Sequence, residues 1–233
     1  MDWYSQNKNE LDMQVDDFLN QKIKKSGVHG IVVPHAGYEF SGKIAGKAFS
    51  ALKKSVKRAV ILGPSHHTSL LGVLTSYKKE AYTPFGSINI FNEGFDEGEI
   101  QEHSIDNQVP FLQKLGFKEI LPLMIGQISD MQAVRIAEKL SKINKASYIF
   151  STDLSHFLPY EQAIIKDKKT IEIIKNLDLE NADKIDACGK FPLLVLINLC
   201  KMNNWQPKLI EYKNSGDVTG DKTSVVGYST FYF

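Results

Sequence analysis

Apolar residues along this chain gather in short continuous runs that are separated by longer amphipathic segments. The runs are rich in β-branched residues, and several end at a proline or glycine. A run that is apolar on both faces is typical of a strand covered on both sides by helices. Such strands are expected within residues 29–38, 57–67, 119–126 and 146–157.

The segments between these runs repeat apolar residues at spacings of three and four, which predicts helices. The segment 191–204 is apolar nearly all round, so this helix is expected to be buried. Two further strands are expected within 207–233, around the loop "SGDVTGD". The remaining helices are expected at residues 9–23, 41–54, 102–116, 129–143 and 161–177. This alternation predicts one α/β domain over residues 1–233, with a mostly parallel or mixed central sheet flanked by helices.

Three of the predicted strands end in polar residues that carry chemistry. "IVVPHAGY" leads to His35, "VILGPSHH" leads to His66 and His67, and "YIFSTDLSH" leads to Asp153 and His156. Ligands of open α/β sheets bind beyond the carboxyl ends of the strands, where residues distant in sequence converge. His29 precedes its strand and is therefore expected to lie outside any such site.

A metal site is one interpretation of these strand ends. His35 and His66 offer neutral imidazole nitrogens and Cys188 offers a thiolate, which together make a three-ligand site with open positions. Asp153 and His156 are three residues apart and can share a face, so that the carboxylate orients an imidazole for acid–base work. Taken singly, each residue also has a structural interpretation, such as a surface histidine or a helix cap.

Composition narrows the class of protein further. Lys and Arg total 28 against 27 for Asp and Glu, and this balance gives no sign of a nucleic-acid partner. No apolar run approaches the length of about 20 residues that crosses a membrane. The polar start, "MDWYSQNKNELD", lacks the order of a secretory signal, so a cytoplasmic protein without a membrane partner is expected. Both cysteines are accordingly expected to be free thiols, with Cys200 in the core.

Several blocks of the sequence resemble those of the MEMO family, which includes the mediator of ErbB2-driven cell motility and the B protein of the AmmeMemoRadiSam system. In order, the blocks are "VVPHAGYEFSG", "ILGPSHH", "EHSIDNQVPFL", "STDLSHF", "DACGKFP" and "SGDVTGDKTSVVGY". The resemblance runs from about residue 3 to the end of the chain. It implies the α/β fold of the class III extradiol dioxygenases, which are non-haem iron enzymes.

The resemblance also assigns roles to residues. It implies that His35, His66 and Cys188 bind a metal ion, and that Asp153 and His156 complete the pocket, with His156 at the position of the acid–base histidine. Cys188 departs from the dioxygenases, which carry a glutamate ligand to iron. Iron is the metal that the resemblance implies. Because a thiolate is softer than a carboxylate, copper and zinc are alternatives.

The sequence leaves more than one role open for four further residues. Because adjacent residues of an extended segment point to opposite sides, His67 is expected to serve a second position rather than the ion held by His66. Glu102 has two interpretations, as a residue that lines the same pocket or as a cap of the helix that follows it, and the cap is favoured. His103 is a candidate for the pocket, and Tyr38 is interpreted as a packing residue.

Two functions of different classes follow. The favoured one is a metal-dependent oxidoreductase that acts on a small molecule in the metal pocket. The alternative is a binding module that uses an altered dioxygenase-like pocket to hold a peptide or a protein, such as another component of the AmmeMemoRadiSam system. A zinc hydrolase ranks last, because the chain has neither a nucleophile elbow nor an "HExxH" motif.

Overall fold

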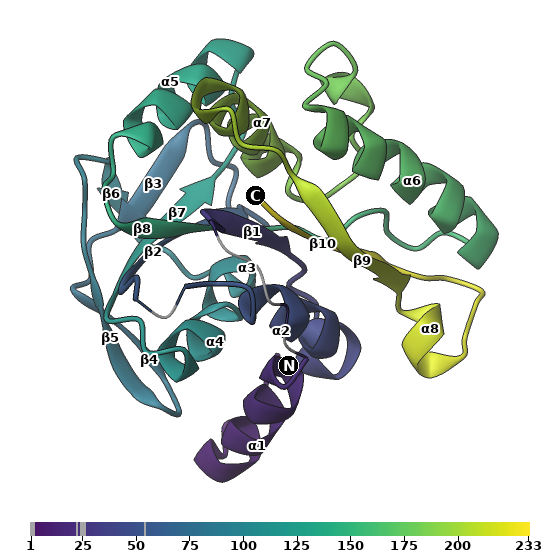
Figure 1. Cartoon of the computed structure of the whole chain (residues 1–233), viewed down its shortest axis with the longest axis horizontal. Coiled ribbons are helices and arrows are strands. Elements are labelled where there is room, and N and C mark those ends of the chain that lie inside the picture. Colours follow the sequence, from purple (N-terminus) through teal and green to yellow (C-terminus); the bar gives the residue numbers. More distant parts are fainter. Residues whose placement is uncertain (1–2, 22, 24–26, 54) are drawn as a thin grey trace.

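The four predicted strands lie side by side and parallel at the centre of one large mixed sheet, as the computed structural model of the chain shows (Figure 1). The structure describes residues 3–21, 23, 27–53 and 55–233, so the parts of the predicted helices at residues 22 and 54 lie outside the described residues. In spatial order the central strands are β7 (Glu119–Ile125), β2 (Arg58–Pro64), β8 (Ala146–Ser151) and β1 (Gly30–Val33). All four therefore end at the same edge of the sheet.

Further strands, most of them antiparallel to their neighbours, extend the sheet beyond this centre. β10 (Gly227–Tyr232) pairs with β1, and β9 (Lys208–Asn214) pairs with β10, as expected for the closing segment. Within that segment the loop "SGDVTGD" contains a short helix, α8 (Gly216–Thr219). On the other side of β7 lie four short strands for which the sequence pattern gave no prediction: β3 (Val73–Ser76), β4 (Glu80–Thr83), β5 (Gly86–Ile90) and β6 (Glu97–Gly98). Most residues of β4 and β5 are at least partly exposed, so neither strand has the continuous apolar run that marks a buried one.

Helices cover both faces of the sheet and form two apolar cores. α5 (Asp130–Ser141), α6 (Tyr160–Asn176) and α7 (Lys190–Asn203) pack on one face, and α1 (Lys8–Leu19), α2 (Lys43–Phe49) and α4 (Val109–Lys114) pack on the other (Figure 1). In β1, Val32 faces the first core while Ile31 and Val33 face the second. This period-two alternation with apolar residues on both sides is the reason that the strands read as continuous apolar runs.

One predicted helix is broken into two at the point where it contacts the chain that follows β1. Instead of one helix over 102–116, the chain forms α3 (His103–Asp106) and α4, with Asn107 and Gln108 between them. The Asn107 side-chain amide donates to the His35 carbonyl oxygen at 2.7 Å, and that of Gln108 donates to the Pro34 carbonyl oxygen at 3.1 Å. These bonds fasten the chain after β1 to the start of α4.

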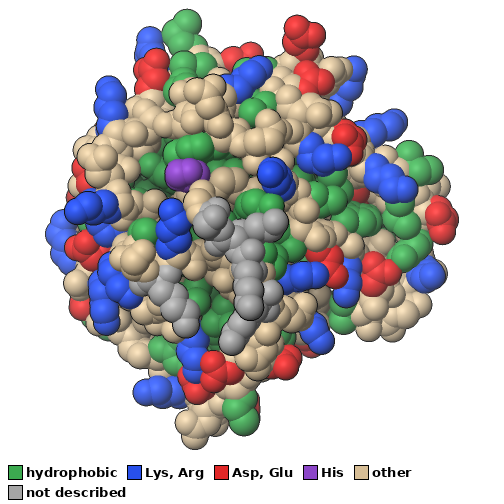
Figure 2. Space-filling model, in the orientation of Figure 1, with side chains coloured by type: hydrophobic (Ala, Val, Ile, Leu, Met, Phe, Trp, Pro, Cys, Tyr) green, Lys and Arg blue, Asp and Glu red, His purple; other side chains and the backbone are tan. Residues whose placement is uncertain are grey.

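The remaining short elements are a π-helix at Tyr38–Gly42, which leads into α2, and a 3-10 helix at Ala182–Lys184 before α7. Among the described residues, no helix combines the length and the apolar character that a membrane crossing requires. Figure 2 shows Lys and Arg side chains and Asp and Glu side chains spread over the same face of the molecule. Together with the formal net charge of +1, this gives a surface of mixed sign on that face.

Candidate metal centre

The polar residues at the ends of the central strands converge at one edge of the sheet. His35 follows β1, His66 follows β2, and Asp153 follows β8. Cys188 joins them from the loop that precedes α7, and His103 from the first position of α3. The expectation that these strand ends converge is therefore confirmed by the contacts described below.

His35 lies in the buried part of this cluster, where its side chain is fixed from several directions. Its ring Nδ1 lies 2.9 Å from the Ser151 hydroxyl oxygen, and its backbone N–H donates to the Asp153 carboxylate at 2.8 Å. Gln108 in turn donates to the same Ser151 hydroxyl at 3.0 Å. Burial, followed by the neighbouring His66 imidazole, lowers the pKa of His35 well below its usual value. The ring is thus neutral, which is the form that binds a metal.

Cys188 contacts the free side of the His35 ring. Its Sγ lies 3.2 Å from His35 Nε2, and the Asp153 backbone N–H donates to the same sulfur at 3.2 Å. Burial raises the pKa of the Cys188 thiol, and the Asp153 carboxylate raises it further. The next residue, Gly189, packs closely on Thr152, because a Cβ atom there would lie 2.5 Å from Thr152 Oγ1.

His66 lies on the open side of the cluster and is held by one carboxylate. Its ring Nδ1 lies 2.9 Å from Glu102 Oε2, and the other oxygen of Glu102 accepts the backbone N–H groups of His66 and His67. Burial alone would raise the pKa of Glu102, but the hydrogen bonds from His66 outweigh it and lower that pKa. An ionised carboxylate behind an imidazole fixes the tautomer that presents Nε2.

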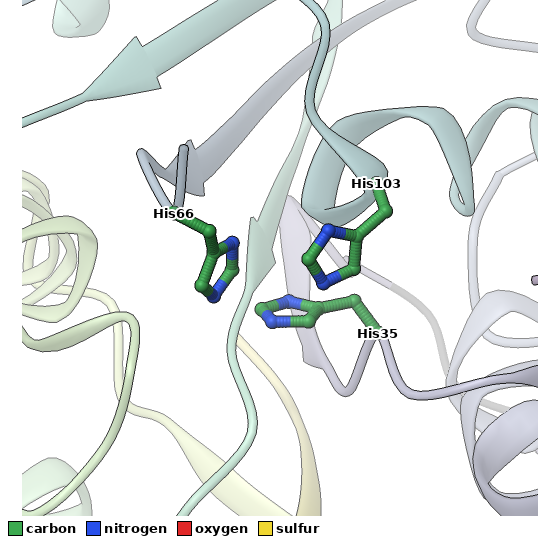
Figure 3. Close-up of side chains that lie close together, drawn as sticks. All are labelled: His35, His66 and His103. Carbon is green, nitrogen blue, oxygen red and sulfur yellow. The ribbon is translucent and has the colours of Figure 1, made fainter. Parts of the chain in front are cut away.

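His103 forms the third wall of the cluster. Figure 3 shows its ring close to those of His35 and His66, with the three side chains coming from three different segments. The His66 and His103 rings stack at 4.5 Å between centroids, and the Trp3 indole stacks on His103 at 4.0 Å. Burial, followed by the His35 and His66 imidazoles, lowers the pKa of His103 to about 4.

These residues suit a transition metal by their donor atoms. One nitrogen each of His35, His66 and His103 lies within 4.8 Å of the other two, and Cys188 Sγ lies against His35. Cys188 and His66 also line one open groove of about 640 Å³. Neutral imidazoles with a nearby thiol form a donor set of the kind that binds iron, copper or zinc. The assignment of His35, His66 and Cys188 as the ligands stays a prediction.

Asp153 and His156 are placed differently from each other. The Asp153 carboxylate is buried and accepts the His35 backbone N–H, whereas His156 is exposed and its ring packs near Phe157 at 5.7 Å. Among the hydrogen bonds of the described residues, none joins the two side chains. Their catalytic roles stay a prediction.

The favoured interpretation of Glu102 as a helix cap was wrong, and its alternative, a place in the pocket, agrees with the structure. The sequence interpretation also missed two residues that support His35. Glu102 makes no side-chain cap of α3, because its carboxylate is directed to His66 and His67 instead. Ser151 and Gln108 were not predicted as site residues, since nothing in their local pattern distinguishes them from structural residues. Tyr38 is confirmed as a packing residue, since it is buried and donates to the Asn107 carbonyl oxygen at 2.7 Å.

The two remaining sequence interpretations agree with the structure. His29 stacks on Trp205 at 4.3 Å between ring centroids. Both cysteines are free, and Cys200 is buried in the core.

The mixed sheet with helices on both faces, and a histidine-rich cluster at its carboxyl edge, define an α/β protein of the extradiol dioxygenase-like type with a candidate metal pocket. Comparison with known proteins then gives the family. The family model described as "Memo-like protein" matches residues 2–232, so the chain belongs to the Memo-like family.

Similar curated proteins are named "MEMO1 family protein". One from Sulfurisphaera tokodaii is 34% identical, with 91% of this chain and 85% of that protein aligned. Another from Methanosarcina mazei is 34% identical over 91% of this chain and 88% of its own length. A third, from Nitrosopumilus maritimus, is 28% identical and covers 99% of this chain and 96% of its own.

Proposed function

We propose that this chain is a metal-dependent oxidoreductase that holds a transition-metal ion between His35, His66 and Cys188, with iron as the expected metal. The observation that carries the proposal is the 3.2 Å contact between His35 Nε2 and Cys188 Sγ. Ligands bound to one ion at the usual nitrogen and sulfur distances lie about 3.6 Å apart in tetrahedral geometry. The observed distance is thus a few tenths of an ångström shorter than this spacing. Among the described residues, the group whose ligand atoms all lie within 4.8 Å of one another pairs His35 and His66 with His103, so the proposal also needs Cys188 Sγ to approach His66.

The residues behind the imidazoles support the same proposal. Ser151 contacts Nδ1 of His35, and Glu102 contacts Nδ1 of His66, so each ring leaves Nε2 for the ion; in His35 this is the nitrogen that contacts Cys188. Such partners orient ligands and raise their basicity. When bound, the ion supplies Lewis acidity and a redox centre for a small oxygen-bearing substrate in the open groove.

His156 is the residue proposed to move a proton in this reaction. Its imidazole is exposed, and the adjacent Asp153 is buried beneath the pocket. Imidazole is the side chain best suited to proton transfer near neutral pH. Asp153 is a positioning residue in this proposal, because its carboxylate holds the His35 backbone rather than the His156 ring.

Anaerobic purification followed by elemental analysis tests the metal proposal. Wild type should carry bound metal, and His35→Ala and Cys188→Ala should each carry one equivalent less per chain. His29→Ala and Cys200→Ala are matched controls that should keep the wild-type content, since both residues lie outside the cluster. Unchanged metal content in Cys188→Ala would refute the ligand set.

Oxygen uptake in the presence of iron tests the redox part of the proposal. The wild-type chain should consume oxygen in an iron-dependent manner with an added reductant. His156→Gln should keep its metal and lose most of this uptake, because only the proton step is removed. Equal uptake by His35→Ala would show that the reaction does not use the pocket.

A binding module is the second candidate, and two exposed apolar residues favour it. Leu71 borders the groove and is 82% exposed, and Phe157 beside His156 is 75% exposed. Phe157 also has a φ of 59°, a left-handed conformation that an aromatic residue rarely adopts. Strained backbone conformations are concentrated at functional sites, so an exposed aromatic residue in such a conformation is a candidate binding residue.

Co-purification with another component of the AmmeMemoRadiSam system, such as its radical S-adenosylmethionine protein, tests this second candidate. Capture that is lost in Leu71→Ser and Phe157→Ser but unaffected by chelator would favour the binding module. Capture that is lost when chelator removes the metal would instead indicate that the partner binds at the metal pocket. Equal capture by wild type and both variants would reject this surface.

A further inference from the structure

A second group of metal-ligating side chains lies beside the first pocket. One ligand atom each of His67, Glu102 and His103 lies within 4.8 Å of the other two. None of these residues belongs to the proposed His35, His66 and Cys188 set. His67 and His103 also line a cavity of about 590 Å³ that Cys188 does not line. His103 and His67 thus border a space on the side away from Cys188, and His67 also borders the groove that His66 and Cys188 line.

His103 supplies the first argument that this group has a ligand. Its side chain is only 12% exposed, and its buried Nδ1 has no hydrogen-bond partner among the described residues. Buried polar atoms are almost always satisfied in native proteins, and each exception calls for an explanation. The Trp3 ring, stacked on His103 at 4.0 Å, holds this nitrogen in place rather than satisfying it.

The distance between His103 and Glu102 supplies the second argument. His103 Nδ1 lies 3.9 Å from Glu102 Oε2, which is too long for a hydrogen bond. Two donors on one ion, each bound at about 2.0–2.2 Å, can lie at most about 4.3 Å apart. The spacing therefore suits two ligands of a common ion.

Glu102 retains capacity for such an ion. Its Oε2 has one close donor, His66 Nδ1 at 2.9 Å, and one distant donor, Ser104 Oγ at 3.4 Å. A carboxylate has about four acceptor positions, and the backbone N–H groups of His66 and His67 take two of them. The Ser104 hydroxyl has one hydrogen and also donates to the Pro64 carbonyl oxygen at 3.0 Å, so the position at Oε2 that faces Ser104 is only weakly occupied. Glu99 and Asp106 line the same cavity and add negative charge, which attracts a cation.

We propose that His67, Glu102 and His103 form a second cation site, so that the pocket holds two ions of different preference. Two imidazoles with one carboxylate suit zinc or ferrous iron, whereas two imidazoles with a thiolate form a softer set. Glu102 connects the sites, because it holds His66 Nδ1 with the oxygen that faces His103. The inference rests on the proposed function in one respect. The inner ion, held by His35, His66 and Cys188, must leave His103 free to bind the second ion.

Anaerobic titration of the metal-free chain with Co²⁺ tests the proposal, because thiolate-to-cobalt absorption reports the inner ion separately. Wild type should bind two ions per chain. His67→Ala should bind one and keep the thiolate band, which also shows that the variant is folded. Cys188→Ala should bind one and lose the band, and the double variant should bind none. His29→Ala is the matched histidine control and should bind two.

Two results would overturn the second site: one ion per wild-type chain together with the thiolate band, or two ions per chain in His67→Ala. A wild type that binds one ion without the thiolate band would instead place that ion on the histidine cluster and reject the Cys188 site. The failure of this inference is thus distinguishable from the failure of the proposed function. Repeating the titration with Zn²⁺, with elemental analysis after dialysis, checks that the count does not depend on cobalt.

Discussion

The two histidines that face the predicted metal position are held in different ways. On the buried side, His35 is 2% exposed and is fixed by Ser151, Asp153 and, through Ser151, by Gln108. On the open side, the His66 side chain is 26% exposed and its ring is held by Glu102. The buried side is thus part of the core of the protein, while the open side depends on one carboxylate. Changes on the two sides should therefore affect different quantities.

The largest expected effect is on folding and comes from the buried side. Gln108→Ala removes the bonds to Pro34 and Ser151 and leaves a cavity, so the free energy of unfolding should fall by about 2–4 kcal/mol. Urea denaturation measures this free energy of unfolding. The control Gln14→Ala, on the exposed face of α1, should change the free energy of unfolding by less than about 0.5 kcal/mol. Equal effects from both variants would show that the buried side is no better fixed than the surface.

The second-largest expected effect is the stabilisation of the folded protein by the bound ion, which contacts both sides. At a metal concentration 100 times its Kd, binding should stabilise the wild type by about 2.7 kcal/mol. For a chain of this size the Tm should rise by about 5–10 °C in a thermal scan. When His67→Ala has removed the second site, Cys188→Ala should show no such rise, because it lacks the sulfur that contacts His35, while Cys200→Ala in the same background should retain it. A rise of the same size in Cys188→Ala would assign the ion to the histidines alone.

A smaller effect, on metal affinity rather than folding, is expected on the open side. Glu102→Gln keeps the size of the side chain but removes the charge behind His66, so metal affinity should fall about 10–100-fold. Competition with a chromophoric chelator measures this change. Glu138→Gln, on the exposed face of α5, is the control and should leave affinity unchanged. A loss of stability without a loss of affinity would make Glu102 a structural residue.

The smallest effect should have the opposite sign. Phe157 has a φ of 59° and is 75% exposed, so Phe157→Gly should relieve backbone strain while losing little packing. We expect stability to rise by about 0.5–1 kcal/mol, whereas Phe157→Ala, which keeps the strain, should not gain. Parallel urea curves of the two variants check this. A glycine variant less stable than the alanine variant would show that the aromatic ring contributes packing.

The local pattern of residues determined most of the fold. The central strands β1, β2, β7 and β8 appear in the sequence as apolar runs because both of their faces are covered by helices. The edge strands β4 and β5 could not be predicted in this way, because they are short and partly exposed. Their place in the sheet comes from pairing with each other and with β7, which is not encoded in their own pattern.

For the site, the sequence determined which residues gather, since parallel strands place their ends at one edge. Only the tertiary structure decided what each one contacts. Glu102 precedes a helix and has the position of a cap, yet its carboxylate holds His66, 36 residues away. Asp153 stands near His156 in sequence, yet its carboxylate holds the backbone of His35. The physical reason is that hydrogen bonds depend on direction and distance in space, which strand order sets and local spacing does not.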